Sequence, residues 1–114
     1  MRVSVEHHVD ASDIDADGFH DWYYEYDVYR FSRGAISFVA RAYMDELDKV
    51  AFLSRELNIF GFRRHRLLNA ADLRSSLFAA AVAHLRGLGM ISFDRLTKTD
   101  GYVPVEDARA DGLL

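Results

Sequence analysis

Apolar and polar residues alternate along much of the chain, as they do in β-strands that have one buried face. The stretch from Trp22 to Phe31, with the sequence WYYEYDVYRF, is rich in aromatic residues and is the clearest predicted strand. A turn at residues 32–34 joins it to a second alternating stretch, Ala35–Met44, and together they predict an antiparallel hairpin. Residues 3–9 alternate in the same way and are compatible with one more strand.

Two further segments extend the predicted sheet. Val50–Leu57 either continues the meander as a third strand, which we favour, or begins a helix, since Leu53 and Leu57 are spaced by four. Residues 90–96 and 102–105 flank a short polar turn and predict a final hairpin. Its second arm carries the only proline of the chain, which places that arm at a sheet edge.

A helical pattern covers residues 70–89. Asn69 is the predicted N-cap, and Asp72 stands in the first turn, where a carboxylate suits the positive end of a helix. The residues that recur at helical spacing are Leu73, Leu77, Ala80, Ala81, His84, Leu85 and Leu88. The sequence therefore predicts an α+β fold: a small antiparallel sheet, made of a meander plus a C-terminal hairpin, with one main helix packed on one face.

The chain has 114 residues, half of them hydrophobic, which suits one globular domain with a single core. We place this domain at residues 1–105 and expect residues 106–114 to form a loose tail. The first ten residues lack the apolar core of an export signal, and the longest apolar run, Leu77–Ala83, is far shorter than the roughly 20 residues that cross a bilayer as a helix. With the absence of cysteine, this predicts a cytoplasmic protein without a membrane partner.

The formal net charge of −4 is unevenly distributed. Residues 1–30 hold eight acids and two arginines, whereas residues 31–114 carry a small excess of bases. The acidic balance disfavours nucleic acid as the main partner, and the aromatic pattern of RNA-binding sheets is absent. The acidity is thus a property of the N-terminal part of the chain.

The sequence DIDADGFHD at residues 13–21 has the spacing D-x-D-x-D-G-x-x-D. Carboxylates at alternate positions of a tight loop can converge on a hard cation such as Ca²⁺. The motif resembles the first nine positions of an EF-hand loop and, more closely, the calcium loops of integrin-type propeller repeats. This resemblance implies a calcium site formed by the backbone carbonyl of Phe19 and the side chains of Asp13, Asp15, Asp17 and Asp21.

The motif also departs from both of these families. The twelfth position of an EF-hand loop is a bidentate glutamate, but here it is Tyr24, and Glu25 comes one place too late. Propellers are built of repeats, and this chain has one such loop. A solvated turn is the alternative interpretation, since aspartate and glycine favour turns for their own reasons. Calcium is the one cofactor that the sequence suggests, as an alternative to none.

Catalytic motifs are missing from the sequence. It contains no cysteine, no G-x-S-x-G motif and no glycine-rich phosphate loop, and its five histidines do not have the spacing of a zinc site. The chemistry of a nucleophile or a nucleotide site is therefore not indicated. A small enzyme whose site is assembled from residues distant in sequence stays open as a further alternative.

The tyrosine, tryptophan and arginine side chains favour protein binding. Both are enriched at the centres of protein interfaces. The leading hypothesis is a small non-catalytic protein-binding or regulatory domain, such as an inhibitor or neutralising partner of a basic protein. We expect it to recognise its partner through the acidic N-terminal loop and the tyrosine-rich hairpin. Homodimerisation is an open alternative, because exposed hairpin edges must be covered. The predicted partner-binding residues are Trp22, Tyr24, Tyr26, Tyr29, Tyr43, Arg63, Arg64 and Arg66.

Overall fold

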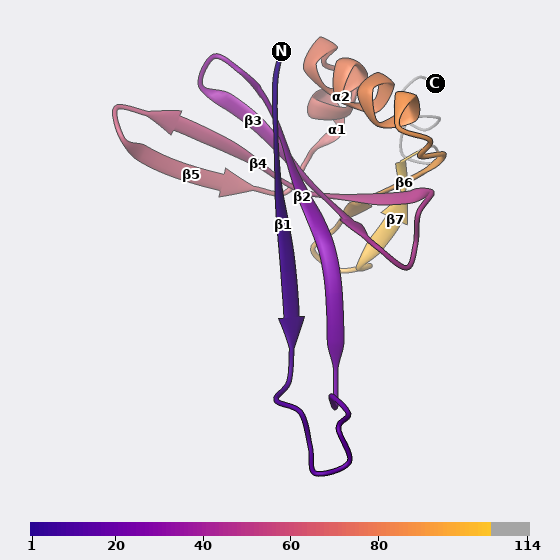
Figure 1. The fold of residues 1–114 in the computed structure, drawn as a ribbon. Helices are drawn as coiled ribbons and strands as arrows, with labels where there is room; N and C mark the ends of the chain where they lie inside the picture. The colour runs from indigo at the N-terminus through magenta and orange to yellow at the C-terminus, as the bar shows by residue number, and fades with distance from the viewer. Residues whose placement is uncertain (106–114) are drawn as a thin grey trace.

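The computed structural model describes residues 1–105, which form one mixed sheet of seven strands and two short helices (Figure 1). The predicted tail, residues 106–114, lies outside the described residues. The elements in chain order are β1 (Arg2–Ala11), β2 (Tyr23–Arg33), β3 (Ile36–Tyr43), β4 (Lys49–Ile59), β5 (Phe62–Arg66), α1 (Ala70–Leu73), α2 (Ser76–Gly87), β6 (Ser92–Leu96) and β7 (Tyr102–Pro104).

The strands predicted from alternation are confirmed, including the strand interpretation of Val50–Leu57, which lies within β4. The sheet order is β1-β2-β3-β4-β6-β7, and β5 also pairs with β4. One edge of β4 is shared between two partners: Lys49–Phe52 pair with β6 in parallel, and Arg55–Ile59 pair with β5 in antiparallel orientation. This division of the β4 edge makes the sheet mixed.

The predicted fold class, a small antiparallel sheet with one main helix, is therefore wrong. The structure is mostly sheet, with seven strands of mixed direction and two short helices. Strand β5 was not expected because its sequence, FRRHR, has no apolar alternation, and all five of its residues are exposed. The parallel β4–β6 pair joins segments that are separated by β5 and both helices, and local periodicity does not report such a pairing.

The predicted single helix is divided in two because Ser75 interrupts it. Its hydroxyl accepts a hydrogen bond from the backbone N–H of Phe78 and donates one to the carbonyl of Asp72, so Ser75 serves as the N-cap of α2. The predicted N-cap at Asn69 is confirmed and forms a capping box with Asp72. Within residues 1–105, neither helix is long and apolar enough to cross a membrane.

The core lies between α2 and one face of the sheet. Phe78 of α2 contacts Phe52 and Phe38, with ring centroids 4.7 Å and 6.0 Å away. Phe31 packs between Phe52 and His84 of the helix. Phe31, Phe52 and Phe78 are at most 1% exposed, so these buried phenylalanines fix the helix on the sheet.

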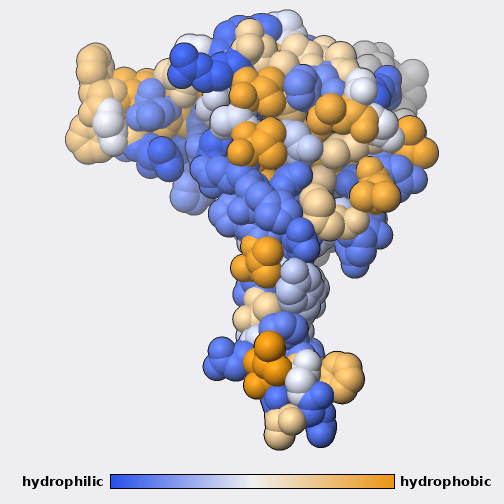
Figure 2. All heavy atoms as spheres, in the orientation of Figure 1, coloured by the Kyte–Doolittle hydropathy of each residue, from blue (hydrophilic) through white to orange (hydrophobic). Residues whose placement is uncertain are grey.

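Two hairpins project from this core (Figure 1). The longer one consists of β1 and β2, and it ends in the loop at residues 12–22. The shorter one consists of β4 and β5, with Phe60 and Gly61 at its turn. The molecule is accordingly elongated, with extents of 54 × 36 × 31 Å. Figure 2 shows apolar residues at the far end of both projections, away from the core.

We predict that Phe52→Ala lowers the free energy of unfolding by about 3–5 kcal/mol, because the variant leaves a cavity beneath α2. The matched control is Phe19→Ala in the projecting loop, where the side chain is 68% exposed and its loss leaves no cavity. Urea denaturation of both variants measures the difference. Equal losses would contradict a core confined to the α2 side of the sheet.

Candidate protein-binding surface

The face of the sheet opposite α2, here called the open face, carries a cluster of aromatic side chains. Neighbouring residues of a strand point to opposite faces, so β2 places Tyr29 in the core and Tyr26 on the open face. Tyr26 stacks on His8 of β1 at 5.3 Å and meets Tyr43 of β3 edge to face at 5.6 Å. Tyr24 lies 6.1 Å from Tyr43. We call His8, Tyr24, Tyr26 and Tyr43 the aromatic cluster.

Arg41 extends the aromatic cluster toward the C-terminal strands. Its guanidinium carbon lies 4.9 Å from the ring centre of Tyr43 and 5.8 Å from that of Tyr26, which are cation–π distances. Its Nη2 donates a hydrogen bond of 2.6 Å to the hydroxyl of Tyr102 on β7. The open face therefore presents connected aromatic and cationic groups from β1, β2, β3 and β7.

A shallow hollow lies beside Arg41. Its volume is about 210 Å³, whereas small-molecule sites usually measure roughly 300–1,000 Å³. The lysine of the hollow is already paired, since Lys49 Nζ lies 3.4 Å from a carboxylate oxygen of Asp94. This arrangement favours contact with a surface over capture of a small molecule. The lining residues are Arg41, Tyr43, Glu46, Lys49, Val50, Ala51, Asp94 and Tyr102.

The loop at the end of the β1–β2 hairpin, residues 12–22, is held in shape by its own polar groups. Asp15 Oδ1 accepts hydrogen bonds of 2.9 Å from the backbone N–H groups of Asp17 and Phe19. Ser12 Oγ accepts from the N–H groups of Asp21 and Trp22. The loop thus holds its apolar residues outward, and Ile14, Phe19 and Trp22 are 63%, 68% and 49% exposed. We call residues 12–22 the acidic tip.

The predicted calcium ligands all lie in the acidic tip. Asp15 directs its carboxylate at backbone N–H groups, and the carbonyl of Phe19 accepts a bond from the N–H of Asp15. In the part of the chain that the structure describes, no group of three or more His, Asp or Glu side chains is arranged to hold a metal ion. The structure therefore does not bring Asp13, Asp17 and Asp21 together with Asp15, and calcium binding stays a prediction.

The predicted partner-binding residues lie in four different parts of the structure. Tyr24, Tyr26 and Tyr43 come together on the open face, and Trp22 lies in the acidic tip next to them in sequence. Tyr29 is only 7% exposed and stacks on Phe31 in the core, so it is not available to a partner. The three arginines lie on the other projection, in β5.

Arg66 has a structural role in β5. Its guanidinium donates a hydrogen bond of 2.6 Å to Oδ2 of Asp72, the residue that completes the Asn69 capping box. Burial acts to raise the pKa of Asp72, but the hydrogen bonds from Arg66 and from the backbone N–H of Asn69 outweigh it and hold this pKa below its ordinary value. Arg63 and Arg64, in contrast, have no ion pair within residues 1–105.

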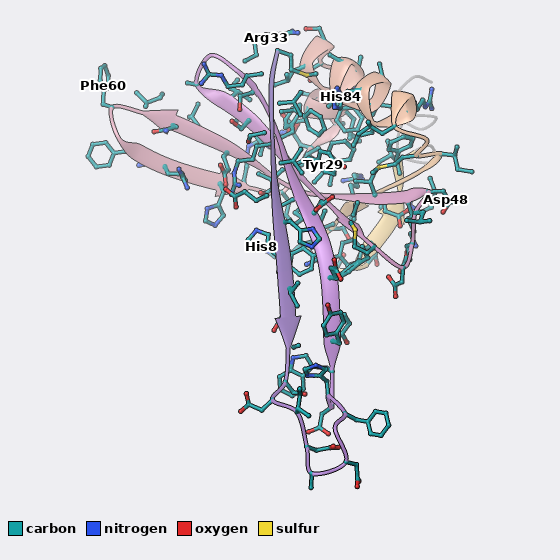
Figure 3. All side chains as sticks on the ribbon, in the orientation of Figure 1. His8, Tyr29, Arg33, Asp48, Phe60 and His84 are labelled. Atoms are coloured by element: carbon teal, nitrogen blue, oxygen red, sulfur yellow. The ribbon has the colours of Figure 1, made fainter. Side chains whose placement is uncertain are left out.

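Phe60 is an exposed aromatic residue that the sequence did not reveal. With Gly61 it forms the two-residue turn between Ile59 and Phe62, and both turn residues have positive φ angles, 51° and 83°. Such turns favour Asn-Gly, because a bulky side chain is strained in the left-handed region. The side chain is also 96% exposed, so packing within the protein does not offset the strain (Figure 3).

His7 lies on the β1–β2 hairpin between two carboxylates. Its Nδ1 is 2.7 Å from Asp27 Oδ1, and its Nε2 is 2.8 Å from Glu25 Oε2. The hydrogen bond with Asp27 is the largest cause that raises the pKa of His7; desolvation opposes it, and the bond with Glu25 adds to the rise. Protonated His7 therefore ties β1 to β2 in the projecting part of the sheet.

We predict that stability falls as the pH rises through the pKa of folded His7. Because this pKa is raised above the ordinary 6.5, the contribution is fully present below about pH 6.5 and is lost above the raised value. Urea denaturation between pH 5.5 and 8.5 measures the effect. His7→Gln should flatten the profile, whereas His65→Gln in β5 should not; identical profiles for both would contradict the prediction.

We also predict that Phe60→Asn raises the free energy of unfolding by up to about 1 kcal/mol, because asparagine tolerates the left-handed conformation of this turn. The control is Phe62→Asn, two residues away on β5, which loses strand propensity and gains nothing at the turn. Thermal denaturation compares the two. A Phe60→Asn variant that is no more stable than the native protein would contradict the strain at Phe60.

Comparison of the chain with protein-family models, with curated proteins and with solved structures found no match in any of the three. The acidic tip and three residues of the aromatic cluster, His8, Tyr24 and Tyr26, share the β1–β2 hairpin, and Tyr43 joins them from β3. The exposed Phe60 lies on the other hairpin.

Proposed function

We propose that the protein is a non-catalytic protein-binding domain that recognises a basic protein partner through the β1–β2 hairpin. The recognition surface consists of the acidic tip and the aromatic cluster on the open face. The proposal keeps the sequence-based hypothesis of a regulatory or neutralising partner that binds through the acidic loop and the tyrosine-rich hairpin, and it narrows the aromatic contacts to the open face. Arg63 and Arg64, on the other hairpin, are left out of this surface.

The observation that carries the proposal is the exposure of large aromatic side chains on an ordered projection. Phe19, Trp22 and Tyr24 are 68%, 49% and 52% exposed. Trp and Tyr bring a large contact area to an interface and lose little side-chain entropy there. The hydrogen bonds of Asp15 and Ser12 hold the loop before a partner arrives, which lowers the entropic cost of binding.

The charge of the hairpin indicates the chemistry of the partner. The sequence has no lysine or arginine between Arg2 and Arg30, while Asp13, Asp17 and Asp21 are exposed in the tip. Carboxylates around an aromatic patch attract a basic surface during encounter and disfavour acidic ones. A binder of this kind acts by covering a basic surface of its partner.

The test is photo-crosslinking in an extract of the native host, with p-benzoyl-phenylalanine in place of Phe19. We expect an adduct with a basic protein that weakens as salt is raised. The adduct should be lost in the Asp13→Asn/Asp17→Asn/Asp21→Asn variant, which spares Asp15 because its carboxylate holds the loop.

The matched control carries the photo-crosslinker in place of Leu47, which is 80% exposed in the turn between β3 and β4. Adducts that are the same from both positions, or that survive removal of the three carboxylates, would overturn the proposal. Circular dichroism of each variant checks that the sheet is intact.

A further inference from the structure

Strand β1 forms one end of the sheet, and no strand within residues 1–105 pairs with its outer edge. All ten of its residues pair with β2 without interruption, from Arg2 with Ser32 to Ala11 with Tyr23, and the strand has no proline. The opposite end of the sheet is β7, which is only three residues long and carries Pro104. Short length and proline are common devices that block edge pairing, and β1 has neither of them.

We propose that β1 pairs in antiparallel orientation with β1 of a second copy, so that one sheet continues across a two-fold axis. The backbone N–H and C=O groups of β1 point alternately toward β2 and outward. An outward residue of one copy must therefore face an outward residue of the other. As a result, an even-numbered residue of one copy can face only an even-numbered residue of the other, and an odd-numbered residue can face only an odd-numbered one.

Side-chain chemistry selects one of the allowed registers. If Glu6 faces Glu6 of the second copy, two carboxylates meet at the axis. A shift by one residue along each strand places Glu6 opposite His8 of the second copy and Val5 opposite Val9 of the second copy. His7 then faces His7 of the second copy at the axis, where Asp27 and Glu25 of its own chain, 2.7 Å and 2.8 Å from its ring nitrogens, offset the charge of each imidazole. The Glu6–His8 and Val5–Val9 pairs each occur twice by symmetry. A carboxylate that can accept a hydrogen bond from an imidazole, and apolar pairs, stabilise an antiparallel ladder when they lie directly across it.

This register also covers apolar surface that the single chain leaves in water. Val5 and Val9 are 51% and 54% exposed, and both lie on β1. In the proposed dimer Val5 of each copy packs against Val9 of the other. The outward N–H and C=O groups of β1 also gain hydrogen-bond partners. The charges of β1 then determine the register instead of preventing pairing.

The two-fold axis is perpendicular to the sheet, so both open faces lie on the same side. The two β1–β2 hairpins run in opposite directions, and their acidic tips lie at the two ends of the dimer. His8, which stacks on Tyr26, lies next to the seam and joins the two aromatic clusters into one surface. This inference uses the edge of β1 and does not depend on the proposed function of the tip.

The first test is light scattering after size exclusion over a series of concentrations. We expect twice the chain mass of 13.0 kDa for the native protein. Val5→Lys/Val9→Lys should give the single mass, while Leu47→Lys/Leu88→Lys, which changes two exposed residues outside the β1 edge, should remain dimeric. A native protein that is monomeric up to millimolar concentration, or a control that dissociates equally, would overturn the proposal.

The second test uses the absence of cysteine from the chain, since any disulfide must then come from an introduced pair. His7→Cys should form a disulfide dimer by itself under mild oxidation. Glu6→Cys and His8→Cys should form one only when the two variants are mixed. Either the cysteine pair at position 7 or the pair between positions 6 and 8 lies at a non-hydrogen-bonded site of the ladder. The two strands are closer there, and cross-strand disulfides form readily.

Rapid self-crosslinking of Glu6→Cys alone would overturn the proposed register. Equal crosslinking of all three variants, or of a Leu47→Cys control, would show random collision and overturn the interface. Photo-crosslinking from the Phe19 position is measured separately, so a failed dimer leaves the test of the proposed function unchanged.

Discussion

The contact of Phe78 with Phe52, with ring centroids 4.7 Å apart, holds the helical layer on the sheet. Through it α2 covers the centre of β2, β3 and β4, and the short α1 follows from the capping groups at Asn69 and Ser75. Because the core is confined to this area, neither α1 nor α2 lies over the distal half of the β1–β2 hairpin. The exposed aromatic residues of that hairpin are thus a direct result of where α2 packs.

Several elements of the fold could be predicted because their signal is local. Alternation identified β1 to β4 and the C-terminal hairpin, and the capping residues identified the start of α1 at Asn69. The sheet architecture could not be predicted in this way. Strand β5 is formed by pairing with β4 and not by a buried face of its own, and the parallel β4–β6 pair depends on a crossover through the helices.

The candidate surface could be predicted in part for the same reason. Tyr24 and Tyr26 share a face by period-two counting, and Tyr43 joins them through the hairpin. Tyr29 points to the opposite face of the sheet, and the same counting could have excluded it from the predicted partner-binding residues. Arg41 and Tyr102 come together across sixty-one positions of sequence, a contact that only the tertiary fold creates. Nothing in the sequence marks the strain at Phe60, which arises from the turn geometry.

The division of the core between early strands and a later helix has a consequence for synthesis. Ribosomes release a chain from its N-terminus, so the strands that carry Phe31, Phe38 and Phe52 emerge before α2 exists. During that interval an apolar sheet face and an unpaired edge of β4 are both exposed to water. The nascent chain then resembles an aggregation-prone intermediate. The fold is completed only when residues 76–96 have emerged and form the helix and the parallel strand.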